Sequence, residues 1–281
     1  MAFRVAQISD THLSAAHPEF TANFAHLAEH LRAVRPDLVL HTGDVSAHGE
    51  LAIDDLRFAR AQMDGLGLDW LAVPGNHDVG NDTVLGGATP ADAARLARWR
   101  ETFGMDWHRR DIPGWRVIGL DTLITTAGLP ESEAQFAFLE EALATADGRR
   151  IALFQHKPLC RDRLSDTEMT YWPVLPAARR RLLDLLAGHD VAFVASGHLH
   201  QWWDRGLCDG LRQIWAPAVA FVVGDTWQER WGGKPLGYVE HVLHADGGHE
   251  CRLVEPAGLD RHDIGLMPAV YGPHAPLTEH A

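Results

Sequence analysis

Seven candidate metal ligands occur in five short blocks of the sequence that are rich in Asp, His and Asn. The blocks are Asp10-Thr11-His12, Gly43-Asp44, Gly75-Asn76-His77-Asp78, the single His156, and Gly197-His198-Leu199-His200. Asp and His hold Mn, Fe or Zn in hydrolytic centres, and Asn adds a neutral carbonyl oxygen. Seven ligands exceed the number that one ion can use, so the set predicts a centre of two metal ions. None of the blocks contains a cysteine, which argues against a purely structural zinc site.

Each block directly follows a short apolar run that has the composition of a buried β-strand. These runs cover residues 3–8, 38–40, 71–73, 151–154 and 191–194. Uninterrupted apolar runs that end in Gly, Ser or Pro are typical of strands covered on both faces. Ligands of open α/β sheets bind beyond the carboxyl ends of the strands. The five blocks are therefore expected to form one site.

The segments between these runs have helical spacing. Apolar residues recur at helical intervals in residues 24–31, 56–66, 136–143 and 182–186, and Ser132 with Gln135 forms a capping-box pattern before the third of these. Further strands are expected at residues 117–120, 211–215, 238–243 and 251–254. Strands alternate with helices up to about residue 200 and then follow one another. This order indicates an α/β fold with a mixed sheet, or two packed sheets, flanked by helices.

The C-terminal third of the chain has two unusual segments. Residues 256–281 contain four prolines and no periodicity, so we expect residues 1–255 to form the domain and 256–281 an irregular arm. Five of the ten tryptophans lie between Trp202 and Trp231. This Trp-rich lobe, about residues 202–235, is expected either to pack in the core or to form a pocket wall or a homodimer contact.

Composition limits the classes of partner and compartment. The 281 residues carry a formal net charge of −13, which argues against binding to nucleic-acid polymers, because that affinity depends on Lys and Arg. The three cysteines form no Cys-x-x-Cys pair and predict no disulfide framework. The sequence begins without a signal peptide pattern, and no apolar run is long enough to span a membrane. We therefore expect a cytoplasmic protein without a membrane partner.

The order of the five blocks resembles that of the calcineurin-like metallophosphoesterase superfamily over residues 5–200. The first block reads Ile-Ser-Asp-Thr-His-Leu from Ile8, and the last reads Gly-His-Leu-His from Gly197. Both are most similar to the bacterial branch of class III cyclic nucleotide phosphodiesterases and glycerophosphodiesterases. The resemblance implies an αββα sandwich of two mixed β-sheets flanked by helices.

The resemblance also implies a role for each residue of the blocks. One metal ion is expected to be bound by Asp10, His12, Asp44 and His200. The other is expected to be bound by Asp44, Asn76, His156 and His198, so that Asp44 bridges the pair. His77 is expected to be a catalytic residue that holds the substrate and protonates the leaving alkoxide. Asp78 is expected to support its loop or His77, or to be purely structural.

Two positions depart from the pattern of that branch. The fifth block reads Gln155-His156-Lys157-Pro158 where the branch has His-His-Pro-Pro. Lys157 is expected to be solvated or, alternatively, to place positive charge near the phosphate. The run Arg179 to Arg181 is expected on a solvated helix face. The residues after Asp44 lack the Asp-Arg-Gly of protein serine/threonine phosphatases, which argues against that activity.

The expected function is hydrolysis of a small phosphodiester, such as a cyclic nucleotide or a glycerophosphodiester, by in-line attack of a metal-held hydroxide. Two divalent or trivalent transition metal ions, Mn, Fe or Zn, are the expected cofactors. The alternatives are a phosphomonoesterase or nucleotide pyrophosphatase on the same centre and, from a different class, a metal-binding scaffold without catalysis. Lys157 would suit a monoester dianion, whereas Tyr171, Trp172 and the Trp-rich lobe would suit the second substituent of a diester.

Overall fold

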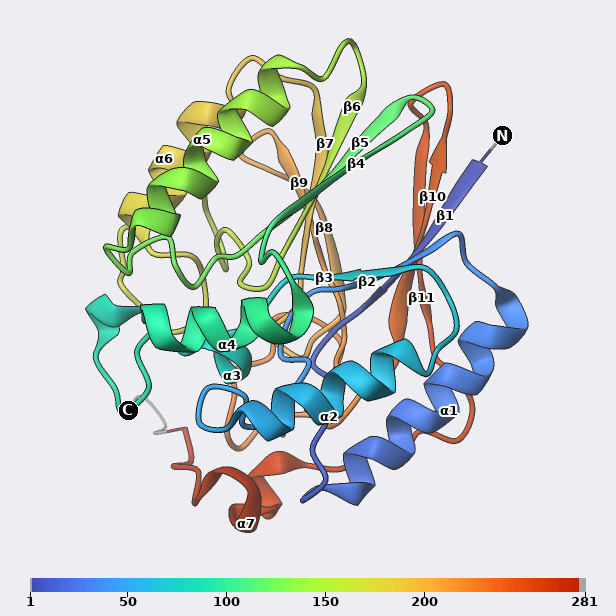
Figure 1. The fold of residues 1–281 in the computed structure, drawn as a ribbon, viewed down its shortest axis with the longest axis vertical. Coiled ribbons are helices and arrows are strands. Elements are labelled where there is room, and N and C mark those ends of the chain that lie inside the picture. The colour runs from blue at the N-terminus through green and yellow to red at the C-terminus, as the bar shows by residue number, and fades with distance from the viewer. Residues whose placement is uncertain (1, 278–281) are drawn as a thin grey trace.

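Two mixed β-sheets packed face to face form the centre of the protein, and helices cover both outer faces, as seen in Figure 1. The computed structural model describes residues 2–277. The first sheet contains β1 (Ala2–Ile8), β2 (Leu38–His41), β3 (Trp70–Ala72), β10 (Tyr238–His244) and β11 (His249–Val254). The second contains β4 (His108–Ile112), β5 (Trp115–Leu120), β6 (Arg150–Gln155), β7 (Val191–Ser196), β8 (Trp203–Cys208) and β9 (Leu211–Trp215). The expected αββα sandwich is confirmed.

Each sheet combines parallel and antiparallel strands: the parallel strands lie at the centre of the second sheet, but in the first sheet they extend to the edge strand β3. The first sheet has the order β11-β10-β1-β2-β3, with β1, β2 and β3 parallel and β10 and β11 antiparallel. The second has the order β4-β5-β6-β7-β9-β8, with β5, β6, β7 and β9 parallel. The strands that precede the five blocks, β1, β2, β3, β6 and β7, all belong to the parallel parts. Their carboxyl ends therefore lie at one edge of each sheet.

The helices form two outer layers. Those of the first sheet are α1 (Pro18–Val34), α2 (Ile53–Asp64) and α4 (Ala93–Phe103), and those of the second are α5 (Pro130–Ala144) and α6 (Pro176–Leu186). Short helices are α3 (Asn76–Val79), η1 (Thr83–Leu85), η2 (Ile264–Leu266) and α7 (Pro268–Tyr271). The sequence did not predict α4, β4 or β8.

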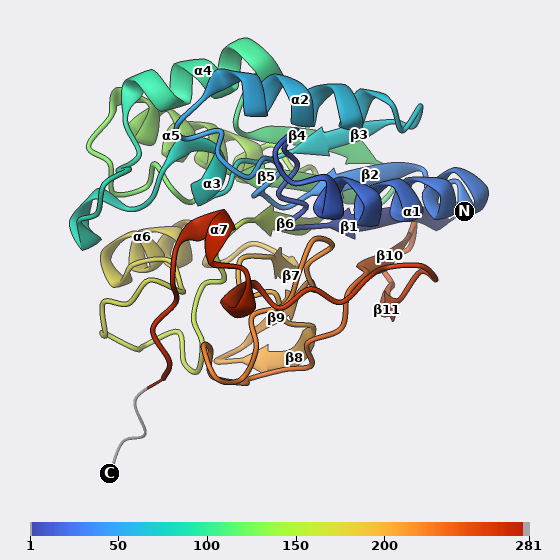
Figure 2. The ribbon, with the colours of Figure 1, turned by 90° about the horizontal axis from the view of Figure 1, so that it is seen from below.

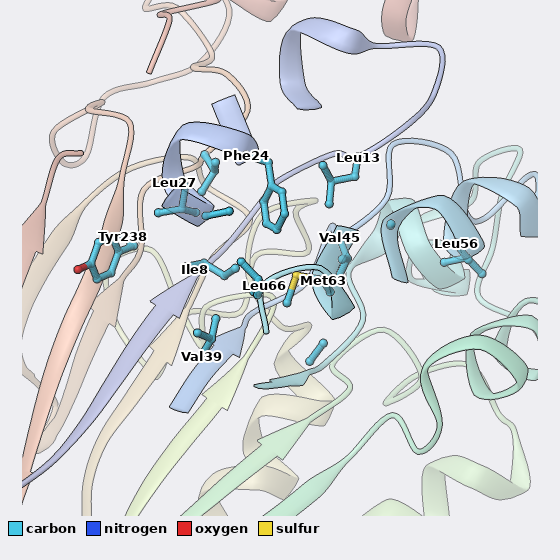
Figure 3. Close-up of a cluster of buried hydrophobic side chains, with 14 of the residues drawn as sticks. Ile8, Leu13, Phe24, Leu27, Val39, Val45, Leu56, Met63, Leu66 and Tyr238 are labelled. Atoms are coloured by element: carbon cyan, nitrogen blue, oxygen red, sulfur yellow. The ribbon is translucent and has the colours of Figure 1, made fainter. Parts of the chain in front are cut away.

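Alternate side chains of the central strands fill different cores. Val39 points toward α1 and α2, whereas its neighbours Leu38 and Leu40 point into the core between the sheets. This is the period of two expected for a strand. Figure 3 shows the core under α1 and α2, where Ile8 and Val39 belong to one buried cluster with Phe24, Leu27 and Met63. Because both faces of the sheets are buried at their centres, the central strands β2, β6 and β7 are mostly apolar, whereas the edge strands β4 and β11 contain charged residues.

The C-terminal segment is more ordered than expected. Figure 2 shows this red segment crossing the molecule from β11 to α7. Ile264 of η2 is buried against Phe20 and Phe221, and Val222 pairs with Asp263 in an isolated bridge. The prediction of an irregular arm from residue 256 is therefore wrong for η2 and α7, because the apolar contacts of Ile264 hold the segment on the domain. Residues 278–281 of the expected arm lie outside the described residues.

Two local predictions are wrong because tertiary contacts use the side chains differently. Ser132 and Gln135 do not cap α5, which begins at Pro130; the Gln135 amide pairs with the backbone of Asp121, and the Ser132 hydroxyl donates to Ile124 O. Arg179 is buried and donates to the carbonyls of Leu159 and Val174, among others. Arg180 and Arg181 are exposed, as predicted.

The five tryptophans of the expected lobe lie in different environments. Trp202 packs beside the core between the sheets, and Trp203 contacts Trp215 edge to face across β8 and β9. Trp227 and Trp231 lie in the connection from β9 to β10. Among residues 2–277, no helix is long and apolar enough to cross a membrane.

Candidate metal centre

The five blocks lie in the loops that leave β1, β2, β3, β6 and β7. The loops after β1 and β2 run side by side: Asp10 N donates to Gly43 O at 3.0 Å, and His12 N donates to Asp44 O at 3.0 Å. Gly197 N donates to His156 O within the second sheet, and His198 N donates to Asp10 Oδ2 of the first sheet. His77 N of the loop after β3 donates to Oδ1 of Asp44. The structure thus brings all five blocks together, as the positions at strand ends predicted.

Left-handed backbone is concentrated at these loops. Eight non-glycine residues of the described chain have positive φ, and five of them are predicted ligands: Asp10, His12, Asp44, His198 and His200. Such conformations cost free energy, on the order of 1–3 kcal/mol each, and persist where surrounding contacts enforce them. The strain is located at the predicted centre and turns these side chains inward.

Two glycines allow the loops to approach so closely. A Cβ at Gly43, whose φ is +94°, would lie 2.5 Å from Nδ1 of His156. A Cβ at Gly197 would overlap Ser9 and lie 2.7 Å from Oδ2 of Asp10. Any larger residue would therefore push apart groups that the centre needs together.

The first predicted ligand set has the spacing of a metal site. Nε2 of His200 lies 3.3 Å from Oδ1 of Asp10 and 3.4 Å from Nε2 of His12. Nε2 of His12 lies 3.9 Å from Oδ2 of Asp44. Asp10, His12 and His200 form one of the groups whose donor atoms all lie within 4.8 Å of one another.

The second predicted set meets the first at Asp44. Nε2 of His156 lies 3.4 Å from Oδ2 of Asp44 and 3.2 Å from Oδ1 of Asn76. Asp44, His156 and His198 form another group of converging donor atoms. Oδ2 of Asp44 therefore faces one histidine from each set, which is the position required of a bridging carboxylate.

Backbone carbonyls orient the histidine rings. Nδ1–H of His156 donates to Thr42 O at 2.8 Å, and Nδ1–H of His200 donates to Phe221 O at 2.9 Å. Both rings are thereby oriented with Nε2 toward the centre, where it can serve as the donor atom to a bound ion. Nε2 of His198 faces Tyr171 O at 3.4 Å, which leaves Nδ1 of that ring for a metal ion.

The centre has the electrostatics of a cation site. Oδ1 of Asp10 is buried without a hydrogen-bond donor among the described residues. Burial lowers the pKa of His156, but Asp44 outweighs burial and raises it to about 9; Asp10 likewise raises the pKa of His200 above its usual value. The carboxylates thus favour positive charge at these positions, and metal ions would supply it. The residues fit a centre of two ions.

His77 and Asp78 have different surroundings. Nδ1–H of His77 donates to Ala47 O at 3.2 Å, and its ring lies beside those of His12 and Tyr271. Oδ2 of Asp78 accepts from the N–H groups of Val45 and Gly75, and Oδ1 accepts from Ser46. Asp78 therefore ties the loops after β2 and β3 together, which is the loop-supporting role predicted for it.

A cavity of about 310 Å³ opens over the centre. His12, Asp44, His77, His198 and His200 lie at its base. Its walls are apolar or aromatic and contain Tyr171, Trp172, Phe221, Val223, Trp227, Ile264 and Tyr271, with His274 beside them. No lysine or arginine of the described chain is among the lining residues.

Lys157 contradicts both expectations for it. The side chain is buried, and its ammonium donates to Oδ2 of Asp82 at 2.5 Å and to Oδ1 of Asn81 at 2.8 Å. It is therefore neither solvated nor available as free positive charge near the phosphate. The ion pair joins the loop after β6 to the loop before η1, and it lies behind the ring of Tyr171.

The sequence matches the model of a known family. Residues 3–202 match the calcineurin-like phosphoesterase model. The chain belongs to this family. Membership indicates a metal-dependent phosphoester hydrolase, and the convergent Asp and His groups fit the binuclear site of such an enzyme. A search among curated proteins finds no significant match to this sequence.

Solved structures of similar fold include three at low sequence identity. A purple acid phosphatase from yellow lupin seeds has a TM-score of 0.62 and 17% identity; the match covers 94% of this chain but only 53% of the lupin chain. GAP50, the anchor in the inner membrane complex of Plasmodium, has a TM-score of 0.62 and 15% identity; the match covers 92% of this chain and 86% of the GAP50 chain. A dimetal phosphatase from Danio rerio has a TM-score of 0.58 and 14% identity; the match covers 90% of this chain and 97% of the Danio rerio chain. At these identities the likeness concerns the fold alone.

Sequence reasoning missed several residues of the cavity. Tyr271 and His274 come from the segment that was expected to be irregular, and Phe221, Val223 and Ile264 carried no signal of their own. Tyr171 and Trp172, which the sequence suggests as contacts for a diester substituent, both line the cavity. Nε2 of His17 and Nε2 of His48 are 3.1 Å apart and form a hydrogen bond, and neither residue is among those that line the cavity.

Proposed function

We propose that the protein is a binuclear metal-dependent phosphodiesterase that hydrolyses small diesters with a flat, apolar substituent, of the cyclic nucleotide type. The lining of the cavity carries this proposal: aromatic rings surround the centre, and no lysine or arginine of the described chain lines it. A diester is a monoanion and needs room for its second substituent. A monoester dianion would demand additional positive charge or donors at its free oxygens.

The shape of the cavity supports a small substrate. Its volume of about 310 Å³ is at the lower end for small-molecule sites. Tyr171 and Trp172 meet edge to face on one side of the centre, and Trp227 lies on another wall. A nucleobase or aryl group can stack on such rings, which contributes roughly 1–3 kcal/mol per base. The net charge of −13 and the small cavity together disfavour a nucleic-acid polymer.

The residues at the base of the cavity have distinct tasks in this proposal. Bound metal ions would supply a water of lowered pKa and neutralise the phosphoryl oxygens. Asp10, Asp44 and the ligand histidines would hold the ions, and the backbone carbonyls behind the rings of His156 and His200 orient Nε2 of each ring toward the centre. His77 lies in the cavity beside the metal ligands, where its ring can protonate the departing alkoxide.

Phosphomonoesterase activity is the second candidate. Two solved structures of similar fold are named phosphatases, the lupin and Danio rerio proteins. At such low sequence identity the likeness concerns the fold and does not extend to the substrate. The lining of the cavity is therefore the stronger argument, and it favours a diester. A scaffold without catalysis is the third candidate, because GAP50 of the same fold is named as an anchor. Retention of all seven predicted ligands and His77 disfavours it.

The test compares an aryl phosphate diester with the corresponding aryl phosphate monoester for the Mn-, Fe- and Zn-loaded protein. The proposal predicts a higher kcat/KM for the diester. Trp172→Leu should raise KM for the aryl diester, whereas Trp70→Leu, a partly buried tryptophan on β3 outside the cavity, should not. Faster monoester hydrolysis would favour the phosphatase, and no hydrolysis with any metal would favour the scaffold.

A further inference from the structure

Two of the three tyrosines contact predicted metal ligands through their hydroxyl groups. The hydroxyl of Tyr271 lies 2.7 Å from Nδ1 of His12, and that of Tyr171 lies 3.2 Å from Nδ2 of Asn76. His12 belongs to the predicted first metal site and Asn76 to the second. Each site therefore has one tyrosine hydroxyl behind one of its ligands.

Tyr271 determines which nitrogen of His12 carries the proton. Its hydroxyl has the carbonyl of Ala47 at 3.3 Å as an acceptor, so its oxygen can accept a hydrogen bond from Nδ1–H of His12. Nε2 of His12 is then unprotonated, and it faces Asp44 and His200. Unlike the rings of His156 and His200, which use backbone carbonyls, His12 depends on a side chain for this orientation.

The C-terminal segment holds Tyr271 in place from a great distance along the chain. Ile264 is buried, and Val222 N donates to His262 O while Ile264 N donates to Val222 O. The Tyr271 ring packs 4.5 Å from that of His77. The segment therefore contributes to a site whose predicted metal ligands all come from residues 10–200.

Tyr171 orients the second site in a comparable way. Its hydroxyl accepts from Nδ2 of Asn76, which turns Oδ1 of the amide toward Nε2 of His156, 3.2 Å away. A reversed amide would present N–H groups to a cation. The backbone carbonyl of Tyr171 also faces Nε2 of His198, and the two rings lie 4.8 Å apart.

We propose that Tyr271 and Tyr171 are positioning residues, one for each metal ion: Tyr271 fixes the tautomer of His12, and Tyr171 fixes the amide orientation of Asn76. This inference rests on the proposed two-ion centre but not on the preference for diesters. Loss of groups that orient metal ligands typically weakens metal binding by roughly 10- to 100-fold.

The test measures Co²⁺ affinity in two backgrounds that each keep one site. Asn76→Ala removes a ligand of the second site and leaves the first; His12→Ala removes a ligand of the first site and leaves the second. Tyr271→Phe should weaken the retained ion roughly 10- to 100-fold in the Asn76→Ala background and leave it unchanged in the His12→Ala background. Tyr171→Phe should show the reverse. The visible spectrum of the retained Co²⁺ should shift only in the matching combination.

The third tyrosine provides a matched control. The Tyr238 hydroxyl contacts Nε2 of His30 at 3.2 Å, on β10 and α1, outside the cavity. Tyr238→Phe should change neither affinity. Equal weakening in both backgrounds by either variant, or no weakening in any, would overturn the positioning roles. A wild-type protein that binds one ion would overturn the two-ion centre and this inference with it, whereas monoester preference with two ions bound would contradict only the proposed substrate.

Discussion

Five predicted ligands lie on left-handed backbone, and this conformation connects sequence to chemistry at the residue scale. Asp10, His12, Asp44, His198 and His200 are held there by hydrogen bonds between loops, so the donor atoms converge before any ion binds. Pre-organisation of this kind reduces the free energy needed to assemble a centre. The Asp78 carboxylate accepts three hydrogen bonds from Val45 and Ser46 of the loop after β2 and one from Gly75 of its own loop.

His77 provides the first prediction at this scale. If its ring protonates the leaving alkoxide, His77→Ala should keep both metal ions and lose roughly 10²- to 10⁴-fold in rate. The loss should be smaller for diesters with acidic leaving alcohols, because these depart as anions without a proton. Rates for a series of leaving groups, with the metal content of the variant, check it. Loss of an ion, or equal impairment for good and poor leaving groups, would instead make His77 a ligand or a phosphate anchor.

At the element scale, a network of hydrogen-bonded polar side chains joins the two sheets at a distance from the metal centre. Arg212 on β9 donates to Nδ1 of His249 on β11 at 3.3 Å, Nε2–H of His249 donates to Nδ1 of His241 on β10, and Nε2–H of His241 donates to Oε1 of Gln7 on β1. Both rings stack on Phe193. Burial, with Arg212 second, lowers the pKa of His249 to about 3, and burial lowers that of His241 well below its usual value.

The lowered pKa values of His249 and His241 predict that the folded protein loses stability as the pH falls. A histidine whose pKa is lowered by folding binds fewer protons when folded, so its stabilising effect is complete above the unfolded pKa, about 6.5, and is lost as the pH falls toward 3. Urea unfolding of the metal-free protein at about pH 7 and about pH 5 measures the effect. His249→Gln should reduce the pH dependence by up to about 1.4 kcal/mol per pH unit below about 6.5.

The matched control is the exposed His189. His189→Gln should leave the pH dependence of unfolding unchanged. An identical pH dependence in wild type and His249→Gln would show that His249 does not stay neutral in the folded state.

The strands that directly precede the predicted metal ligands could be predicted from the sequence. Contacts with residues far away along the sequence could not. The strands before the five blocks are short apolar runs that end in polar loops, so β1, β2, β3, β6 and β7 and their shared edge followed from local pattern. Tyr271 is 259 positions from His12, and nothing in its neighbourhood of the sequence indicates the contact. Lys157 and Arg179 look like surface charges locally, but each is buried against partners supplied by other loops.

At the scale of the whole molecule, self-association remains a prediction. The tryptophans that suggested a homodimer contact have intramolecular neighbours: Trp203 packs on Trp215, Trp227 lines the cavity, and Trp231 lies near Trp172. Leu207, on the edge strand β8, is 76% exposed and is the side chain most available to a partner copy on that strand. Exposed apolar side chains on edge strands favour association.

Light scattering during gel filtration tests this prediction. The wild type should have twice the chain mass of 31.0 kDa, and Leu207→Asp should have the mass of one chain. Val84→Asp, a matched change at an exposed apolar residue of η1, should leave the mass unchanged. A wild-type protein of one chain mass at all concentrations would contradict the dimer.

We expect one chain to hold two metal ions bridged by Asp44, whose Oδ2 faces His12 from one set and His156 from the other. Elemental analysis of the metal-loaded, desalted protein measures this stoichiometry. The wild type should contain two ions per chain, and Asp44→Ala should lose metal from both sites, because a bridging carboxylate serves both. A stoichiometry that never exceeds one ion per chain, with Asp44 intact, would rule out the bridged centre.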